Sequence, residues 1–269
     1  MNFKRILSAI LGLPIVIIVL AFGNKYVIDA IFALIAVITM KEYYNAIKEK
    51  TNPIRWIGYL SAISIAFIHI IPNFDISFIG LFLPSVVAIL FFQSIITEMK
   101  YNLVDIAVTL FGICYITLFI MCIPLISGIL ENKTYIWYMI IAAWGTDIFA
   151  YVFGYTFKLG KHKFNKVSPN KSIEGCIAGT LGAVLISIVY TIICNKLFEL
   201  NISCLEFGIF TAVLSILSQV GDFAASSIKR YADIKDFSNL IPGHGGMLDR
   251  IDSVIFIAPF AYLLYMFIL

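Results

Sequence analysis

Long apolar stretches follow one another along almost the whole chain, and most of them have the length of a membrane-spanning helix. Such a helix needs about 20 mostly apolar residues to cross the hydrocarbon core of a bilayer. Of the 269 residues, 61% are hydrophobic and 13% are charged, whereas a soluble domain carries about 25% charged residues. A chain with so few charges cannot cover a globule with polar side chains. The sequence therefore predicts an all-α integral membrane protein that sits in a lipid bilayer.

We expect about nine transmembrane helices. Their predicted ranges are 6–22, 25–46, 55–71, 76–97, 103–129, 134–157, 174–196, 205–230 and 250–268. The first stretch follows Lys4 and Arg5 and resembles a signal peptide, with Ala21-Phe22-Gly23 as a cleavage site. Because another apolar stretch follows at once, we interpret it as a retained helix. Pro124 predicts a tilt or a kink in the long fifth stretch.

The positive charges predict the orientation of these helices. With the N-terminus inside, 16 of the 19 Lys and Arg residues fall on the inner side, as the positive-inside rule requires. The C-terminus then lies outside. The two longest polar stretches, 158–173 and 229–249, both fall inside. We therefore expect a multi-pass protein of the cell (inner or plasma) membrane, in which helices of residues 1–130 form a scaffold and residues 131–269 carry a site that faces the cytoplasm.

Several residues that often carry chemistry are interpreted as structural. The five cysteines lie in apolar segments without a C-x-x-C pair, so the sequence predicts neither a disulfide framework nor a thiolate metal site. Asp29 and Asp105 lie near helix ends, where we expect water to reach them, and His69 lies near an outer helix end. His162 is interpreted as a loop residue.

Other acids lie inside the apolar helices. A carboxylate there is costly and indicates a functional site. Asp147 and Asp222 each lie several residues from the inner end of a helix, and Asp249 and Asp252 begin the last helix from the same side. All four are candidates for a site at the inner membrane face.

Helical spacing brings some of these residues onto common faces. Asp222, Ser226 and Lys229 share one face, because they are spaced at i, i+4 and i+7. If Asp222 and Asp249 face each other, they offer the oxygen ligands that Mg²⁺ prefers together with phosphate oxygens. The alternative is that each Asp pairs with a nearby Lys or Arg. For the two acids together, beside a basic glycine-rich loop, we favour the metal.

The loop before the last helix combines cations with glycine. Lys229, Arg230 and Lys235 precede Pro242-Gly243-His244-Gly245-Gly246. Small residues let backbone N–H groups approach an anion, and Lys and Arg neutralise phosphate charge. A merely solvated loop on the positive side would explain the cations, but not the glycines followed at once by Asp249-Arg250-Ile251-Asp252.

A second polar segment, Ser168 to Gly175, precedes a helix. Ser172 is predicted to cap that helix, and the first N–H groups would then favour an anion. A plain capped helix start remains the alternative.

Residues 226–252 resemble the signature of the phosphatidate cytidylyltransferases, also called CDP-diacylglycerol synthases. The residues in register are Ser226, Lys229, Arg230, Lys235, Asp236, Ser238, Ile241, Pro242, His244, Gly245, Gly246, Asp249, Arg250 and Asp252. Two further blocks are similar to the same family, Asp147 to Tyr151 with Gly154, and Ser168 to Gly175, in which Ser172 stands where Thr is usual. The resemblance covers about 144–255, and the first half is similar only in hydropathy and length.

The resemblance implies an enzyme that makes CDP-diacylglycerol and pyrophosphate from CTP and phosphatidate. The phosphate of phosphatidate would be the nucleophile, so catalysis would be positioning and charge neutralisation. The implied catalytic residues are Asp222, Asp249, Lys229, Arg230, Lys235, Asp236, His244 and Asp252. The implied substrate-binding residues are Lys171, Ser168, Glu174, Asp147, Ser226, Gly245, Gly246 and Arg250. By the same resemblance, Asp222 and Asp249 would hold Mg²⁺, with room for a monovalent cation such as K⁺. A homodimer is also implied, and no nucleic-acid partner.

Two other functions remain open from the sequence. A related CTP-dependent lipid or polyprenol kinase would also need Mg²⁺ and basic loops. A transporter often shows inverted repeats and broken helices near the membrane midplane. The sequence has no internal repeat, and its polar residues gather at one face.

Overall fold

The computed structural model describes residues 16–71, 77–130, 133–156, 163–164 and 168–268. Residues 6–15 of the first predicted helix, and His162, lie outside this range. The end of that helix is described, since residues 16–22 are helical. The chain divides into two compact units, and each is discontinuous in sequence. The first unit comprises Met1–Gly128 and Tyr231–Arg250, and the second comprises Ile129–Arg230 and Ile251–Leu269.

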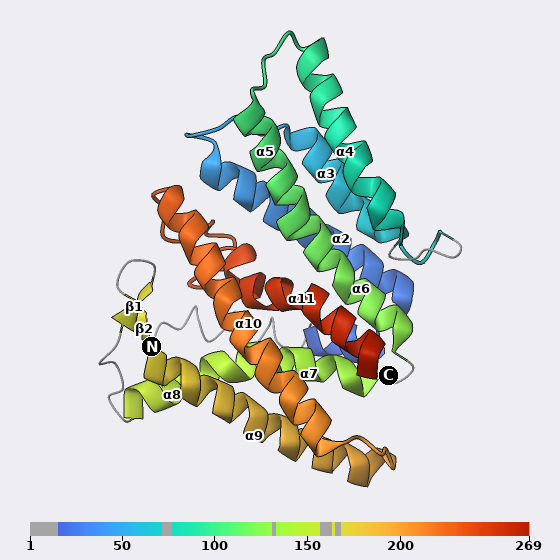
Figure 1. The fold of residues 1–269 in the computed structure, drawn as a ribbon, viewed down its shortest axis with the longest axis vertical. Coiled ribbons are helices and arrows are strands. Elements are labelled where there is room, and N and C mark those ends of the chain that lie inside the picture. Colours follow the sequence, from blue (N-terminus) through green and yellow to red (C-terminus); the bar gives the residue numbers. More distant parts are fainter. Residues whose placement is uncertain (1–15, 72–76, 131–132, 157–162, 165–167, 269) are drawn as a thin grey trace. The chain divides into compact units, whose positions relative to one another are not determined.

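The first unit is built from helices that match the predicted second to fifth stretches (Figure 1). The fifth stretch is one continuous helical segment, in which a π turn at Ile113–Leu118 joins two α-helices. The elements of this unit are α2 (Lys25–Ile47), α3 (Arg55–Ile63), a 3₁₀ turn at Ser64–Phe67, α4 (Ser77–Ile96), α5 (Leu103–Gly112) and α6 (Phe119–Ile129).

The second unit holds the remaining helices and a short hairpin, except that α11 enters this unit only from Ile251 onward. Its first long segment is again interrupted by a π turn, at Ile141–Gly145. Its elements are a 3₁₀ turn at Lys133–Tyr135, α7 (Ile136–Ile140), α8 (Thr146–Thr156), β1 (Lys163–Phe164), β2 (Ser168–Ser172), α9 (Ile173–Phe198), α10 (Cys204–Tyr231) and α11 (Leu248–Ile268). β1 pairs with β2 in an antiparallel sense, with Lys163 opposite Ser172. This hairpin was not predicted from the sequence.

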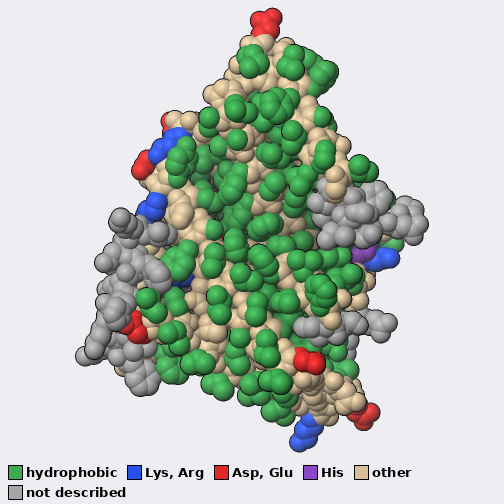
Figure 2. Space-filling view, viewed as in Figure 1, with side chains coloured by type: hydrophobic (Ala, Val, Ile, Leu, Met, Phe, Trp, Pro, Cys, Tyr) green, Lys and Arg blue, Asp and Glu red, His purple; other side chains and the backbone are tan. Residues whose placement is uncertain are grey.

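The helices have the apolar character of a multi-pass membrane protein. Within the described residues, five helical segments are long and apolar enough to cross a bilayer: Leu103–Ile129, Lys133–Gly154, Ile173–Phe198, Cys204–Tyr231 and Leu248–Phe267. Hydrophobic side chains cover most of the face in view in Figure 2, and charged side chains are few there. The all-helical membrane architecture is confirmed in this coarser form. The predicted nine spans and the orientation stay predictions.

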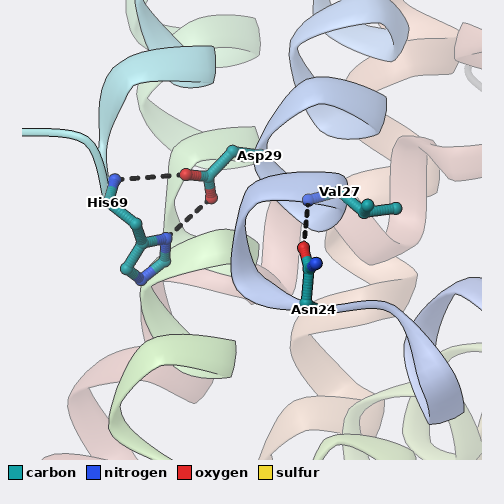
Figure 3. Close-up of polar contacts among 4 residues, drawn as sticks. All are labelled: Asn24, Val27, Asp29 and His69. Atoms are coloured by element: carbon teal, nitrogen blue, oxygen red, sulfur yellow. Dashed lines mark hydrogen bonds and ion pairs between the residues drawn. The ribbon is translucent and has the colours of Figure 1, made fainter.

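Carboxylates near helix ends hold parts of the first unit together. Asp105 forms a capping box with Asn102 at the start of α5, and its Oδ1 also accepts the Asn52 N–H at 2.6 Å. Asp29 of α2 accepts the His69 backbone N–H at 3.1 Å, and His69 Nδ1 donates to the same carboxylate at 2.8 Å (Figure 3). Their structural role is confirmed. The expectation that water reaches them is wrong, because Asp29 is 0% exposed and Asp105 is 4% exposed.

Close contact between α8 and α9 organises the second unit, and these helices lie side by side in Figure 1. Small residues on α9 make the contact possible. A Cβ at Gly182 would stand 2.1 Å from Cγ of Phe149, and a Cβ at Gly179 would stand 2.7 Å from the carbonyl oxygen of Thr146. Both glycines are therefore required by the approach of α8.

Candidate active site

The glycine-rich loop makes a tight turn in the first unit. We call residues 231–247 the signature loop. The Ile241 N–H donates to the Gly245 carbonyl at 2.8 Å, and the His244 N–H donates to the Ile241 carbonyl at 2.9 Å. Gly243 has φ of 78° and Gly245 has φ of 83°. Because a side chain is strained in this left-handed region, glycine is needed at both positions.

Asp249 closes the signature loop from the first turn of α11. Its Oδ2 accepts the Phe237 N–H at 2.8 Å and the Gly246 N–H at 2.9 Å. A Cβ at Gly245 would lie 3.0 Å from the same oxygen. The carboxylate thus joins the two sides of the loop, and the glycine beside it leaves space for that contact.

Glu42, from α2, holds the same loop. Its side chain is buried, and its oxygens accept the Ser238 hydroxyl at 2.6 Å and the N–H groups of Met247 at 2.9 Å and Leu248 at 2.7 Å. These N–H groups stand at the start of α11, where a helix has donors without partners of its own. A carboxylate at this end also interacts favourably with the helix dipole.

Lys50 binds the beginning of the signature loop. Its Nζ lies 2.7 Å from the Asp233 carboxylate and 4.8 Å from the centre of the Tyr231 ring, and it donates to the Tyr231 carbonyl. The end of α2 and the turn after it therefore hold both ends of the loop.

In the second unit, Asp222 of α10 pairs with Lys171 of β2. Lys171 Nζ lies 2.6 Å from Asp222 Oδ2, and each side chain is 27% exposed. The same ammonium stands 5.2 Å from the centre of the Phe223 ring. The ion pair that was considered as the alternative to a metal ligand is thus present for Asp222.

More charged residues gather around this pair. Asp252 of α11 is 6% exposed, and its carboxylate interacts electrostatically with Asp222, Lys229 and Asp147. Gly221 lets α11 approach α10 here, because a Cβ at this position would stand 2.5 Å from Cβ of Phe256. Three of the predicted acids and two predicted lysines, Asp147, Asp222, Asp252, Lys171 and Lys229, are therefore grouped within one unit.

Buried and half-buried polar contacts support the helices that carry this group. Gln219 Nε2 donates to Thr180 Oγ1 at 2.9 Å, and Ser215 Oγ donates to the same hydroxyl at 3.0 Å. Ser215 Oγ also lies 2.5 Å from Thr146 Oγ1. These hydrogen bonds link α8, α9 and α10. The predicted cap of α9 is confirmed, since Ser172 Oγ accepts the Gly175 N–H at 3.2 Å.

The remaining predicted residues differ in how far they are exposed. Arg230, Lys235, Asp236 and Arg250 are exposed, and Ser168, Glu174, Ser226 and His244 are half-buried. Asp147 is exposed on α8.

The predicted metal ligands Asp222 and Asp249 belong to different units, so a shared metal ion stays a prediction. Among the described residues, no cluster of three or more His, Cys, Asp and Glu side chains is arranged to hold a metal ion.

Comparison with known proteins covers nearly the whole chain. The family model described as "Cytidylyltransferase family" matches residues 3–268. The chain belongs to this family. A phosphatidate cytidylyltransferase of Staphylococcus haemolyticus is 33% identical over 263 residues, which are 95% of each chain. The phosphatidate cytidylyltransferases of Bacillus subtilis and Thermotoga maritima are 39% and 40% identical over 132 and 129 residues, about half of each chain.

Two residues that hold the signature loop, Glu42 and Lys50, were not predicted from the sequence. Glu42 satisfies the criterion that selected Asp222, since it is an acid within an apolar helix. That signal could have identified it. Lys50 carries no such signal, because a lysine in a loop on the positive side is ordinary. Only the folded chain brings it to the signature loop.

Proposed function

We propose that the chain transfers the cytidylyl group of CTP to phosphatidate, giving CDP-diacylglycerol and pyrophosphate. The observation that carries this function is the 33% identity, over 95% of both chains, to a relative named phosphatidate cytidylyltransferase. The residues that imply the same reaction form two groups. In the first unit they form a closed glycine turn, and in the second unit they form a group of carboxylates and lysines.

The reaction needs no nucleophile from the protein. An oxygen of the phosphatidate phosphate forms a bond to the α-phosphorus of CTP, and the bond from that phosphorus to the oxygen bridging to the β-phosphorus breaks. Pyrophosphate leaves with the electron pair. The protein then has to align two anions and neutralise their charge. We assign this task to Lys171, Lys229, Arg230, Lys235 and Arg250.

The Lys171–Asp222 pair gives a physical basis for these assignments. Both groups are 27% exposed, so water and anions can reach them. A bound nucleotide phosphate would compete with Asp222 for the lysine ammonium. A cation bound to Asp222 would compete with that ammonium for the carboxylate. The pair therefore keeps the two charges balanced while substrate is absent.

The acids of the chain fit a hard divalent cation, because carboxylate oxygens are the ligands that Mg²⁺ prefers. We propose that Asp222 and Asp249 hold Mg²⁺, with K⁺ as a further cation. Mg²⁺ would neutralise phosphate charge as the bond between the α-phosphorus and the bridging oxygen breaks. Each carboxylate already accepts donors within its own unit, Asp222 from Lys171 and Asp249 from two N–H groups.

We further propose nine transmembrane helices with the N-terminus inside, a site that opens to the cytoplasm, and a homodimer in the cell membrane. The distribution of Lys and Arg supports this orientation. CTP is then available on the side that holds the polar loops, and phosphatidate reaches the site from the bilayer without leaving it.

Labelled CTP separates the proposed reaction from the kinase alternative. Purified protein is incubated with phosphatidate, or with a polyprenol or diacylglycerol acceptor, and with CTP labelled at the α- or the γ-phosphorus. Cytidylyl transfer puts the α label into lipid and the γ label into pyrophosphate. A CTP-dependent kinase puts the γ label into lipid. The second pattern, or no labelled lipid from folded protein, would overturn the proposal.

Removal of the metal or its ligands tests the rest of the site. We expect EDTA to abolish the α label in lipid and added Mg²⁺ to restore it. Asp222→Asn and Asp249→Asn should each lower turnover by at least roughly 10²-fold, because each removes one charge at the reacting phosphates. Glu49→Gln is the control, since its side chain is 84% exposed. Turnover that persists in EDTA would contradict the metal assignment.

A further inference from the structure

The Glu42 carboxylate lies beside the signature loop, although it comes from a part of the chain that the family signature does not include. We propose that Glu42 is a positioning residue that holds the signature loop and the start of α11 in their catalytic arrangement. This inference rests on the proposed function and deepens it. Glu42 acts through the backbone and not through contact with substrate.

The burial of Glu42 requires strong partners. The residue is 5% exposed, and a carboxylate without donors in such surroundings is costly. Its Oε1 accepts the Ser238 hydroxyl and the Met247 N–H, and its Oε2 accepts the Leu248 N–H. Hydrogen bonds to a charged acceptor are stronger than neutral ones. Both oxygens are therefore used to hold the loop, through the Ser238 side chain before the glycine turn and through the backbone after it.

The contact leaves no space at Gly246. A Cβ there would stand 2.8 Å from both oxygens of Glu42, closer than side chains approach one another. This gives a reason for Gly246 that differs from the substrate-binding role implied by the resemblance. The glycine admits the carboxylate of a distant helix to the backbone of the loop.

The residues held by Glu42 adjoin those assigned to chemistry. Leu248 immediately precedes Asp249, and Gly246 is one of the two residues whose N–H groups Asp249 accepts. A shift of the Leu248 N–H therefore moves the Asp249 carboxylate with it. Lys50 holds the other end of the loop, at Tyr231 and Asp233. Glu42 and Lys50 together make α2 and the following turn the support of the loop.

Graded substitutions at position 42 test this role. Gln keeps one of the two acceptor oxygens, and Leu keeps neither while filling similar space. We expect kcat, measured per folded protein, to fall roughly 10-fold in Glu42→Gln and roughly 10²-fold in Glu42→Leu, since small misplacements at a reacting centre cost this much. KM for CTP should change by less than about threefold, because the binding groups themselves remain. Glu49→Gln is the matched acid control.

A second pair of variants tests whether Gly246 and Glu42 act through the same contact. Gly246→Ala should lower kcat by itself. In the double variant it should lower kcat little further than Glu42→Gln alone, because both substitutions disturb the same interaction. Gly80→Ala is the control, since a Cβ at Gly80 meets nothing within 4 Å. Full additivity of the two changes, or normal kcat in folded Glu42→Leu, would overturn the proposal.

Hydrogen exchange gives a readout that does not depend on activity. We expect the Met247 and Leu248 amides to exchange roughly 10- to 100-fold faster in Glu42→Gln than in the wild type. Unchanged exchange would show that Glu42 does not hold the loop and would overturn the inference. Faster exchange together with a wild type that makes no CDP-lipid would instead overturn the proposed function and the catalytic part of this inference, leaving Glu42 as an anchor only.

Discussion

Buried carboxylates of the first unit accept backbone N–H groups from distant parts of the chain. Asp29 accepts the N–H of His69, Asp105 that of Asn52, and Glu42 those of Met247 and Leu248. In apolar surroundings an N–H group cannot turn to water, so each irregular segment needs an acceptor from within the protein. At the scale of single residues, these acids hold the segments between the helices.

The Asp29–His69 contact gives a prediction at this scale (Figure 3). His69→Leu removes a donor from a carboxylate that is 0% exposed. We expect the free energy of unfolding to fall by about 1–3 kcal/mol, because a buried acceptor loses a partner. Thermal unfolding of the purified protein in detergent, calibrated against denaturant, measures this change.

The control for this prediction is a double variant. Asp29→Leu combined with His69→Leu removes both partners, so it should cost less than the sum of the single changes. If the two costs are additive, the contact does not contribute to stability.

At the scale of elements, the approach of α8 to α9 depends on single glycines. Gly182→Ala would place a Cβ 2.1 Å from Phe149, and we expect it to lower stability by about 1–3 kcal/mol through overpacking. Gly208→Ala is the matched control, because its nearest neighbours would stand 3.9 Å away. That change should be neutral or should stabilise α10 by about 0.5–1 kcal/mol, the usual advantage of Ala in a helix. Equal thermal stability of both variants would contradict this account of the packing.

Two helices of the second unit could be predicted closely, and the π turns of the two units could not. The ranges 174–196 and 205–230 correspond to Ile173–Phe198 and Cys204–Tyr231. Membrane-length apolar runs and a cap such as Ser172 are local signals, so they identify these helices. The π turns at Ile113–Leu118 and Ile141–Gly145 have no such signal. Neither the apolar pattern nor a capping residue marks these turns in the sequence.

The candidate site shows the same division. Asp249 and the glycines were found from the sequence because they lie in a motif with fixed gaps, and Asp222 was found because it is an acid inside an apolar helix. The contact between Glu42 and Met247 joins residues 205 positions apart. No periodicity or spacing along the chain relates such a pair. The sequence left open an ion pair of Asp222 with a nearby Lys or Arg, but only the folded chain identifies Lys171 as its partner.

At the scale of the whole molecule, the orientation in the membrane is the prediction that most affects function. We expect Asn239 to face the cytoplasm and Asn201 the exterior, because they lie in loops on opposite sides of the predicted helices. Both are exposed. In a variant without the native cysteines, Asn201→Cys should react with a membrane-impermeant maleimide in whole cells. Asn239→Cys should react only in inverted vesicles, and the reverse pattern would contradict the orientation.

The discontinuity of the first unit has a consequence for how the protein is made. Residues 231–250 complete this unit, although they are synthesised after most of the second unit. Chains grow at about 5–20 residues per second. Met247 is 205 positions after Glu42, so it is synthesised about 10–40 s later. During that interval the nascent chain carries an acid in an apolar helix before the donors of its final structure exist, so the first unit can mature only when synthesis is nearly finished.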